Sequence, residues 1–467
     1  MQNQKLIEKI NIPNPDDESG PNILKIGFIG AIFRSRLFPG VFQAITAAVF
    51  IIIVYQLLLG PASAHDNLGT ALTWVLWWPL IPIIFLFLGR FWCAICPFAT
   101  LSDIVQKFVG NERPVPKFLK KYGIWIIDAV FILITWSDHV FGVVESPWGS
   151  GVLMLGLTTG VVFSGAFWQR RTWCRHLCFL GGLSGNYART GMLALRGTPN
   201  ICAKCTAAAC YKGTEKAPGC PLFEFPKTMD SNANCNVCGD CVKNCPNNSI
   251  SLRLRLPTQE LWFIRKPKIE EAFLAVVIMG IVFVQNVTML EVWQSILTRL
   301  ENVVGTDNYY VTFTITFIVS MLIPVGLLTL TALVAKKFNG NSLAQNFAKF
   351  GYAIIPLDVA GHVGHNLFHL LAEGKSVYLT AMTLFGKEVH GISPALVSIS
   401  TIQTMQYILI VLGAAGSIYT AYRIWKSSAR ESVKSHSWGS LVPYAALILL
   451  LAVMNIWLFI LPMAMRM

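Results

Sequence analysis

The sequence predicts a polytopic α-helical membrane protein of about nine spans, with a small α+β domain inserted between the fourth and fifth spans. Of the 467 residues, 54% are hydrophobic and only 13% are charged, and the mean hydropathy is +0.55. A typical soluble chain carries about 25% charged residues, so an ordinary soluble protein is excluded. Eight of the twelve cysteines lie between Cys202 and Cys245, which indicates a compact metal-binding unit.

Apolar runs of about 20 residues are long enough to cross a bilayer. The nine candidate spans are 39–59, 72–89, 122–141, 151–168, 269–290, 309–335, 350–371, 395–423 and 441–463. They predict four parts: a polar N-terminal segment at 1–38, a four-span membrane domain at 39–168, a cysteine-rich domain at 169–268 and a five-span membrane domain at 269–467.

The positive charges predict the orientation of the chain. With a cytoplasmic N-terminus, the outward segments contain only four of the 37 Lys and Arg residues, namely Arg299, Lys375, Lys387 and Arg466. Basic residues gather on the cytoplasmic side of membrane proteins. We therefore expect a multi-pass protein of the inner (cytoplasmic) membrane, with the 1–38 segment and the 169–268 domain in the cytoplasm and the C-terminus outside. The formal charge of +13 then needs no nucleic-acid partner.

The cysteine-rich domain contains two runs that end in Cys-Pro. The run from Cys235 to Pro246 has the spacing C-x2-C-x2-C-x3-C-P, which binds three thiolates to one four-iron cluster and sends the fourth to a second cluster. A looser run ends at Cys220-Pro221. The crossed sets are Cys202, Cys205, Cys210 and Cys245 for one 4Fe–4S cluster, and Cys235, Cys238, Cys241 and Cys220 for the other. The alternating residues 249–254 predict a strand, so we expect a ferredoxin-like α+β fold, whereas the glycines at 181–185 predict a turn.

Four further cysteines form two pairs, each after a tryptophan and one or more arginines. Cys93 and Cys96 follow the second span, and Cys174 and Cys178 follow the fourth. Equivalent positions at the inner membrane surface favour a shared third iron–sulfur or other metal centre. The alternative is two pairs of reduced interfacial thiols with a packing or redox-dithiol role.

The seventh span carries a polar stripe. At 100° per residue, Asp358, His362, His365, His369 and Glu373 share about 80° of one helix face, and ionisable groups inside a membrane are costly enough to suggest a function. We expect this face to point into the bundle. The histidines could be axial ligands of haem b, ligands of another transition metal such as copper, or part of a quinone and proton path. The remaining alternative is that they are structural. His139 and His390 are candidate second ligands.

These motifs together resemble the membrane-bound polyferredoxins of the NosR/NapH type over residues 30–268. The resemblance lies in tryptophan-led cysteine pairs after two spans and in the two-cluster segment that follows, although the pairs here read Cys93-x2-Cys96-Pro97 and Cys174-x3-Cys178-Phe179 rather than C-x3-C-P. It implies electron transfer between a quinone pool and redox protein partners or subunits.

The leading functional prediction is an integral membrane iron–sulfur protein that passes electrons between cytoplasmic clusters and a quinone or outward-side acceptor. We expect it to be a redox subunit of a quinone-linked oxidoreductase, because no nucleophile–base triad or nucleotide fingerprint is present. Two alternatives stay open. One is a maturation or regulatory factor, such as a metal-ion reductase serving a metalloenzyme. The other is a transporter with a structural cluster domain.

Overall fold

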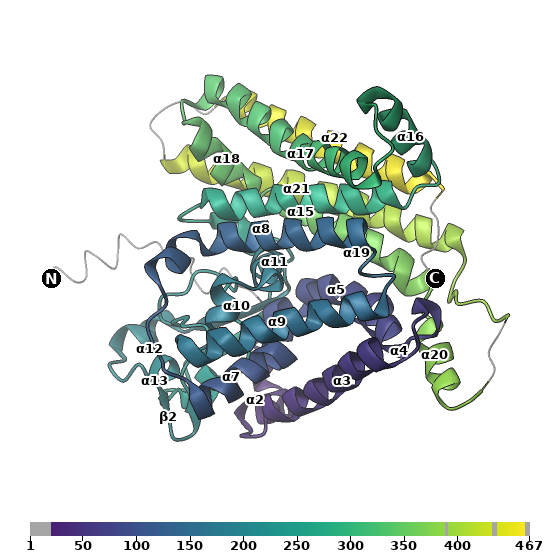
Figure 1. The fold of residues 1–467 in the computed structure, drawn as a ribbon. Helices are drawn as coiled ribbons and strands as arrows, with labels where there is room; N and C mark the ends of the chain where they lie inside the picture. Colours follow the sequence, from purple (N-terminus) through teal and green to yellow (C-terminus); the bar gives the residue numbers. More distant parts are fainter. Residues whose placement is uncertain (1–19, 388–390, 432–436, 463–467) are drawn as a thin grey trace.

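The computed structural model describes residues 20–387, 391–431 and 437–462. Long helices run side by side, and a smaller module of short helices and strands lies at one end of them (Figure 1). The N-terminal membrane half contains α3 (Gly40–Leu59), α4 (Leu68–Thr70), a π-helix (Ala71–Trp77), α5 (Trp78–Leu88), α6 (Trp92–Ile95), α7 (Pro97–Val109), α8 (Lys117–Phe141) and α9 (Pro147–Phe167).

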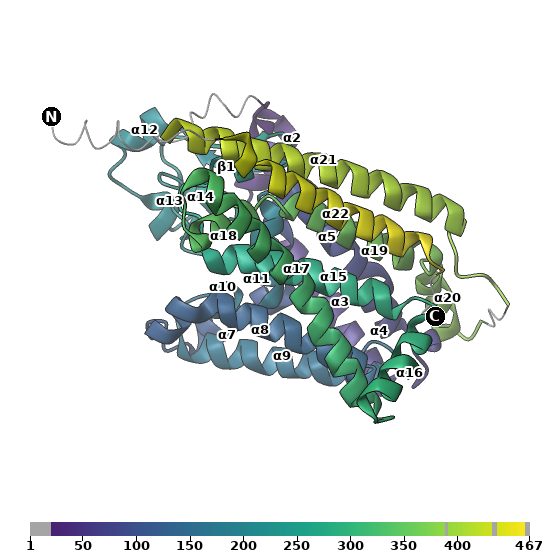
Figure 2. The same cartoon turned by 90° about the horizontal axis from the view of Figure 1, so that it is seen from above.

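The C-terminal membrane half packs against the first through contacts of α15 with α8 and of α19 with α5. It contains α15 (Ile269–Thr288), α16 (Trp293–Val304), α17 (Tyr309–Asn339), α18 (Leu343–Gly351), α19 (Ile355–Ala372), α20 (Ser376–Leu384), α21 (Ile399–Glu431) and α22 (Val442–Ile460). Seen from above, α15, α19, α21 and α22 extend in the same general direction (Figure 2).

Within the described residues, eight helical segments are long and apolar enough to cross a membrane, and each overlaps one of the predicted spans. The seventh predicted span, 350–371, is different: it begins in the last turn of α18 and continues as α19 after a break. Almost every side chain of α19 is buried, because α5, α15 and α21 pack around it. The structure thus supports a helical membrane protein, while the number of passes stays a prediction.

The cysteine-rich module follows α9. It contains α10 (Thr172–His176), α11 (Phe179–Ala188), β1 (Leu193–Gly197), α12 (Pro199–Lys204), α13 (Ala209–Lys212), β2 (Gly213–Thr214), β3 (Ala217–Pro218), α14 (Asp240–Asn244) and β4 (Ile250–Leu254). The expected strand is β4, which pairs antiparallel with β1. Leu195 and Leu252 face each other in this ladder and are buried in the core of the module. The N-terminal segment adds to the same core through Leu24.

The predicted turn at the glycines 181–185 is wrong, because these residues lie inside α11. The glycines are needed for close packing instead. A Cβ at Gly181 would stand 2.5 Å from the carbonyl oxygen of Cys174, and one at Gly182 would stand 2.5 Å from Cγ2 of Ile127. The absence of side chains therefore lets α11 lie directly against α8 and the second membrane cysteine pair.

Candidate iron–sulfur and membrane site

The first cysteine group (Cys202, Cys205, Cys210 and Cys245) comes together around Ser249. The Ser249 hydroxyl lies 2.9 Å from Sγ of Cys202, and the Ser249 backbone N–H donates to Sγ of Cys245 at 3.2 Å. Burial raises the pKa of Cys210 to about 11, and the thiols of Cys245, Cys202 and Cys205 add to this effect. The structure therefore brings Cys245 to the cysteines more than 30 residues earlier, as the crossed assignment predicts.

The second cysteine group (Cys220, Cys235, Cys238 and Cys241) is gathered in the same way. Burial raises the pKa of Cys241 well above its usual range, and Cys235, Cys238 and Cys220 raise it further. Cys210 of the first group also acts on this thiol. The two groups are therefore neighbours inside one module.

The membrane cysteine group (Cys93, Cys96, Cys174 and Cys178) combines a pair that follows α5 with a pair that follows α9. Burial raises the pKa of Cys178 well above its usual range, followed by the effects of Cys174, Cys96 and Cys93. The buried Arg90 bridges the two pairs: its Nε donates to Sγ of Cys93 at 3.4 Å and its Nη2 donates to the Cys174 carbonyl at 3.0 Å. The structure therefore makes the two pairs neighbours, and their sharing of one metal centre stays a prediction.

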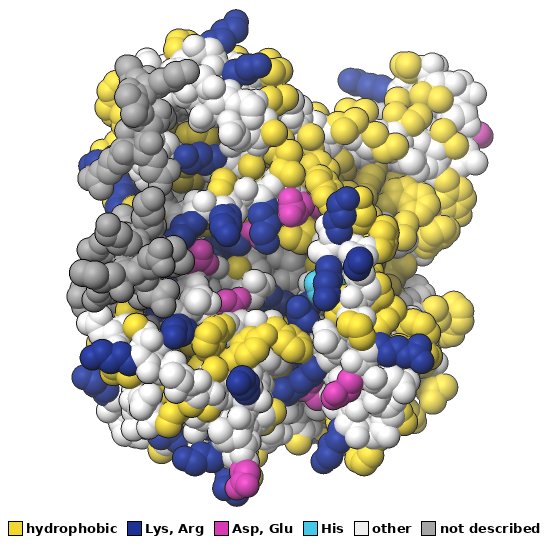
Figure 3. Space-filling model, turned by 90° about the vertical axis from the view of Figure 1, so that its left-hand side faces the viewer, with side chains coloured by type: hydrophobic (Ala, Val, Ile, Leu, Met, Phe, Trp, Pro, Cys, Tyr) yellow, Lys and Arg dark blue, Asp and Glu magenta, His cyan; other side chains and the backbone are white. Residues whose placement is uncertain are grey.

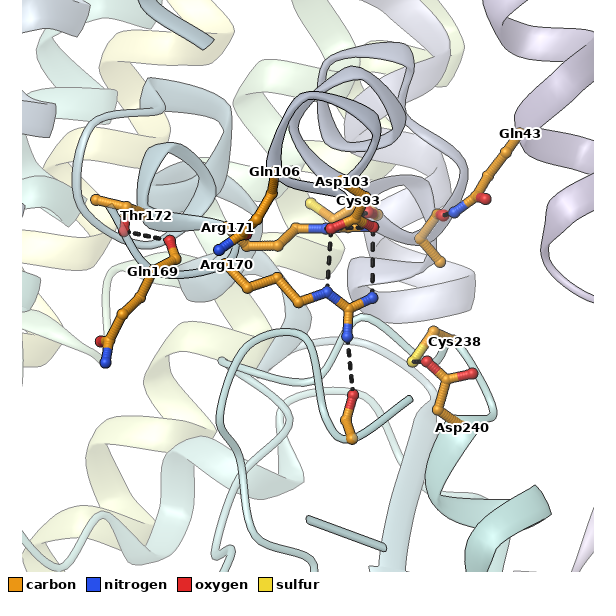
Figure 4. Close-up of polar contacts among 12 residues, drawn as sticks. Gln43, Cys93, Asp103, Gln106, Gln169, Arg170, Arg171, Thr172, Cys238 and Asp240 are labelled. Atoms are coloured by element: carbon orange, nitrogen blue, oxygen red, sulfur yellow. Dashed lines mark hydrogen bonds and ion pairs between the residues drawn. The ribbon is translucent and has the colours of Figure 1, made fainter. Parts of the chain in front are cut away.

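An ion-pair network lies beside this group (Figure 4). Asp103 of α7 accepts from Arg170 at 3.1 Å and from Arg171 at 2.5 Å. Arg171, whose side chain is 3% exposed, also donates to the Cys93 carbonyl at 3.0 Å. This network fixes the loop after α9 against α6 and α7.

Arg171 also marks the boundary between the module and the membrane cysteines. Burial lowers its pKa, but Asp103 and then the thiols of Cys174 and Cys238 raise it, and the net direction is upward. Cys174 belongs to the membrane cysteine group and Cys238 to the second cysteine group. The three groups therefore follow one another in space.

Four-iron clusters fit these groups better than single metal ions do. In the described part of the chain, no three His, Cys, Asp or Glu side chains are arranged to hold one ion. A four-iron cluster binds each thiolate to a different iron atom, so it holds its cysteines further apart than a single tetrahedral ion does. The guanidinium groups of Arg90 and Arg171 would offset the negative charge of a thiolate-ligated cluster at the membrane group.

The polar stripe of α19 faces into the bundle. Asp358, His362, His365 and His369 are all buried, with exposures of 3% or less. Nδ1 of His362 lies 3.1 Å from the Tyr187 hydroxyl. Each of the other two histidines has a partner: Nδ1 of His365 lies 2.8 Å from Oδ1 of Asn286, and Nδ1 of His369 lies 3.2 Å from Oε2 of Glu373.

A small aromatic cavity of about 60 Å³ connects the stripe to the membrane cysteines. The aromatic cavity is lined by Trp74, Trp77, Trp78, Cys178, Gln285, His365, Asn366 and His369, among others. Among the described residues, no hydrogen-bond partner reaches three buried polar atoms on its walls: Nε1 of Trp77, Oε1 of Gln285 and Oδ1 of Asn366. The histidines that line the cavity, His365 and His369, both come from α19, and within the described ranges no histidine of a second helix joins them, so the cavity does not offer the opposed imidazole pair of a bis-histidine haem site.

The candidate second ligands are not brought to this cavity. His139 binds elsewhere, with Nδ1 2.9 Å from the Thr135 carbonyl and Nε2 3.1 Å from the Thr288 hydroxyl, and it stacks on Phe313. His390 lies outside the described residues.

Sequence reasoning missed the tryptophans that line the aromatic cavity, and it noted the arginines before each cysteine pair without predicting their role. Trp74, Trp77 and Trp78 lie within five residues at the junction of the π-helix and α5, and π-helical turns are frequent at functional sites. Three tryptophans within five residues of one predicted span could have indicated this site. For Arg90 and Arg171, the signal was a charge within three residues of a cysteine pair.

Fold and site together define a membrane-helical iron–sulfur protein. Residues 70–116 and 150–197 match a family model described as a 4Fe-4S binding domain. These two segments support two 4Fe–4S clusters and an iron–sulfur protein of ferredoxin type. They contain the two membrane cysteine pairs, and Cys202 to Cys245 follow the second segment. No curated protein and no solved structure matches the chain.

Proposed function

We propose that the protein transfers electrons between a cytoplasmic two-cluster module and quinone in the membrane, through a third four-iron centre at the membrane cysteine group. The module and N-terminus lie in the cytoplasm, the C-terminus lies outside, and the membrane is the inner membrane. On this proposal the chain is a redox subunit of the NosR/NapH polyferredoxin type. Its soluble partners bind at the module.

The observation that carries the proposal is the continuous order of redox-capable groups. Cys210 of the first group acts on Cys241 of the second. Arg171 is influenced by both Cys238 and Cys174, and Cys178 lines the cavity that also contains His369. An electron path from the module to the middle of the helical bundle would need groups in this order.

The unpartnered polar atoms of the aromatic cavity suit quinone and quinol. A buried polar group without a partner is costly, and the indole N–H of Trp77 would donate to a quinone carbonyl. The amide oxygens of Gln285 and Asn366 would accept from quinol hydroxyls.

The stripe supplies a route for protons. His369 lines the aromatic cavity and also a second pocket of about 20 Å³ that contains Glu145 and Glu373. Since His369 contacts Glu373, the pair can pass a proton between the cavity and that pocket. Electrons and protons would then leave a bound quinol in different directions.

The proposal is tested by oxidising the dithionite-reduced protein with a short-chain quinone and following the cluster absorbance. We expect rapid oxidation, and Trp77→Phe should raise the KM for quinone about fivefold, the equivalent of one hydrogen bond of about 1 kcal/mol. Trp148→Phe is the matched control, because Trp148 is 66% exposed and does not line the cavity. Failure of quinone to oxidise the clusters would reject the proposal, and metal uptake into vesicles would instead indicate a transporter.

A further inference from the structure

A third cavity, larger than the two described above, lies where the module meets the membrane helices. It has a volume of about 330 Å³, within the range of small-molecule sites. Its walls come from α8, α10, α11, the start of α15 and the loop before Cys235. Basic side chains gather around a hollow at this end of the molecule (Figure 3). This basic cavity shares no lining residue with the aromatic cavity.

The charge of the basic cavity is strongly positive. Its walls contain six Lys and Arg side chains against three Glu side chains, an excess of three positive charges. The cations are Arg90, Lys120, Lys121, Arg175, Arg189 and Lys268, and the acids are Glu224, Glu270 and Glu271. A concave surface with charge of one sign concentrates ligands of the opposite sign.

The pairing inside the basic cavity leaves three cations for a ligand. Glu271 is satisfied by Arg189 at 2.5 Å and by Lys268 at 2.9 Å. In the described ranges of the chain, Lys120, Lys121 and Arg175 make no ion pair. Lys120 and Lys121 belong to α8 and Arg175 to α10, so two neighbouring helices contribute cations to the cavity.

His176 lines the same cavity next to Arg175. Its Nε2 is buried and has no hydrogen-bond partner among the described residues. As an N–H group, Nε2 would donate to an oxygen of an anion bound beside these cations.

We propose that the basic cavity binds a small molecule carrying a phosphate group, held by Lys120, Lys121 and Arg175. The phosphate can belong to a soluble metabolite or to an anionic lipid headgroup, since the cavity adjoins the ends of membrane helices. Cys174 also lines the cavity, so the ligand lies beside the membrane cysteine group. This inference goes beyond the proposed function and does not depend on quinone.

The test is calorimetric titration of inorganic pyrophosphate into the full-length protein in phosphatidylcholine nanodiscs. We expect saturable binding that the double variant Lys120→Gln/Lys121→Gln weakens about tenfold or more, through loss of charge-assisted hydrogen bonds. The control Lys107→Gln/Lys117→Gln removes the same charge from exposed positions outside the cavity and should bind as the parent does. Glu270→Gln removes an opposing charge and should tighten binding.

Absence of saturable pyrophosphate binding, or equal weakening in the two double variants, would overturn the proposal. Iron content is measured in every sample, and Glu270→Gln provides a gain of affinity that misfolding cannot imitate. Nanodiscs that also contain phosphatidylglycerol distinguish the two sources. Loss of pyrophosphate binding in them assigns the cavity to a lipid headgroup, and retained binding assigns it to a soluble ligand.

Discussion

Crossed ligation in the module makes a specific prediction about single cysteine variants. Cys241 and Cys245 are four residues apart, yet they belong to different groups, whereas Cys245 and Cys202 are 43 residues apart and both contact Ser249. Cys245→Ala and Cys202→Ala should therefore damage the same cluster, and Cys241→Ala should damage the other.

The magnitude follows from the ligand count. Each module cluster carries about four iron atoms on four thiolates, so each variant should lose up to about four of the roughly eight module irons. The assay is iron and sulfide analysis with EPR spectroscopy of the dithionite-reduced protein. Cys202→Ala and Cys245→Ala should lack the same EPR signal and retain the one that Cys241→Ala lacks. If Cys241→Ala and Cys245→Ala lost the same signal while Cys202→Ala lost the other, the crossed assignment would be refuted.

Three further predictions concern the residues around the cysteines. Asp103→Asn leaves the buried Arg171 without its counter-ion, so the free energy of unfolding should fall by about 3–5 kcal/mol. An unchanged melting temperature in a thermal-shift assay would contradict this prediction. Ser249→Ala removes the hydroxyl next to a cluster thiolate. A hydrogen bond that is about 1 kcal/mol stronger in the reduced state stabilises that state, so its loss should lower the reduction potential by roughly 40 mV. An EPR redox titration measures the shift. An unchanged or raised potential would show that the hydroxyl does not donate to the cluster. Gly182→Ala places a Cβ 2.5 Å from a side-chain carbon of α8 and should lower the free energy of unfolding by about 1–3 kcal/mol. Gly326→Ala is the control, because Gly326 has open space around it, and it should be tolerated. Equal stability of the two variants would disprove the close packing.

Local patterns were sufficient to predict the module. The spacing of the two Cys-Pro runs predicts which cysteines gather, even across 43 residues, and the alternation at 249–254 predicts β4 from neighbouring residues. The pairing of β4 with β1 at Leu193–Gly197 could not be predicted in this way, because it joins segments more than 50 residues apart. The glycines at 181–185 were wrongly predicted as a turn for a related reason. The residues that require them, Cys174 and Ile127, lie on other helices, α10 and α8.

The membrane site was predictable as a set of helix faces and not as contacts. A 3.6-residue period places His362, His365 and His369 together, and the cost of exposing them to lipid predicts that they point inward. What they face depends on the rotation of α5 about its axis, which hydropathy does not encode in a helix that is apolar all around. Trp77 and Cys178 were therefore not connected to the stripe before the structure placed them around one cavity.

The claim that electrons pass through the membrane cysteine group is tested most directly with Cys178→Ala. Cys178 lines the aromatic cavity, and the module cysteines are untouched by this change. The measurement is the rate at which a short-chain quinone oxidises the dithionite-reduced module clusters, followed by freeze-quench EPR. We predict that both module signals persist in Cys178→Ala and that quinone no longer oxidises them above the background rate. Oxidation at the parent rate would contradict the proposed path.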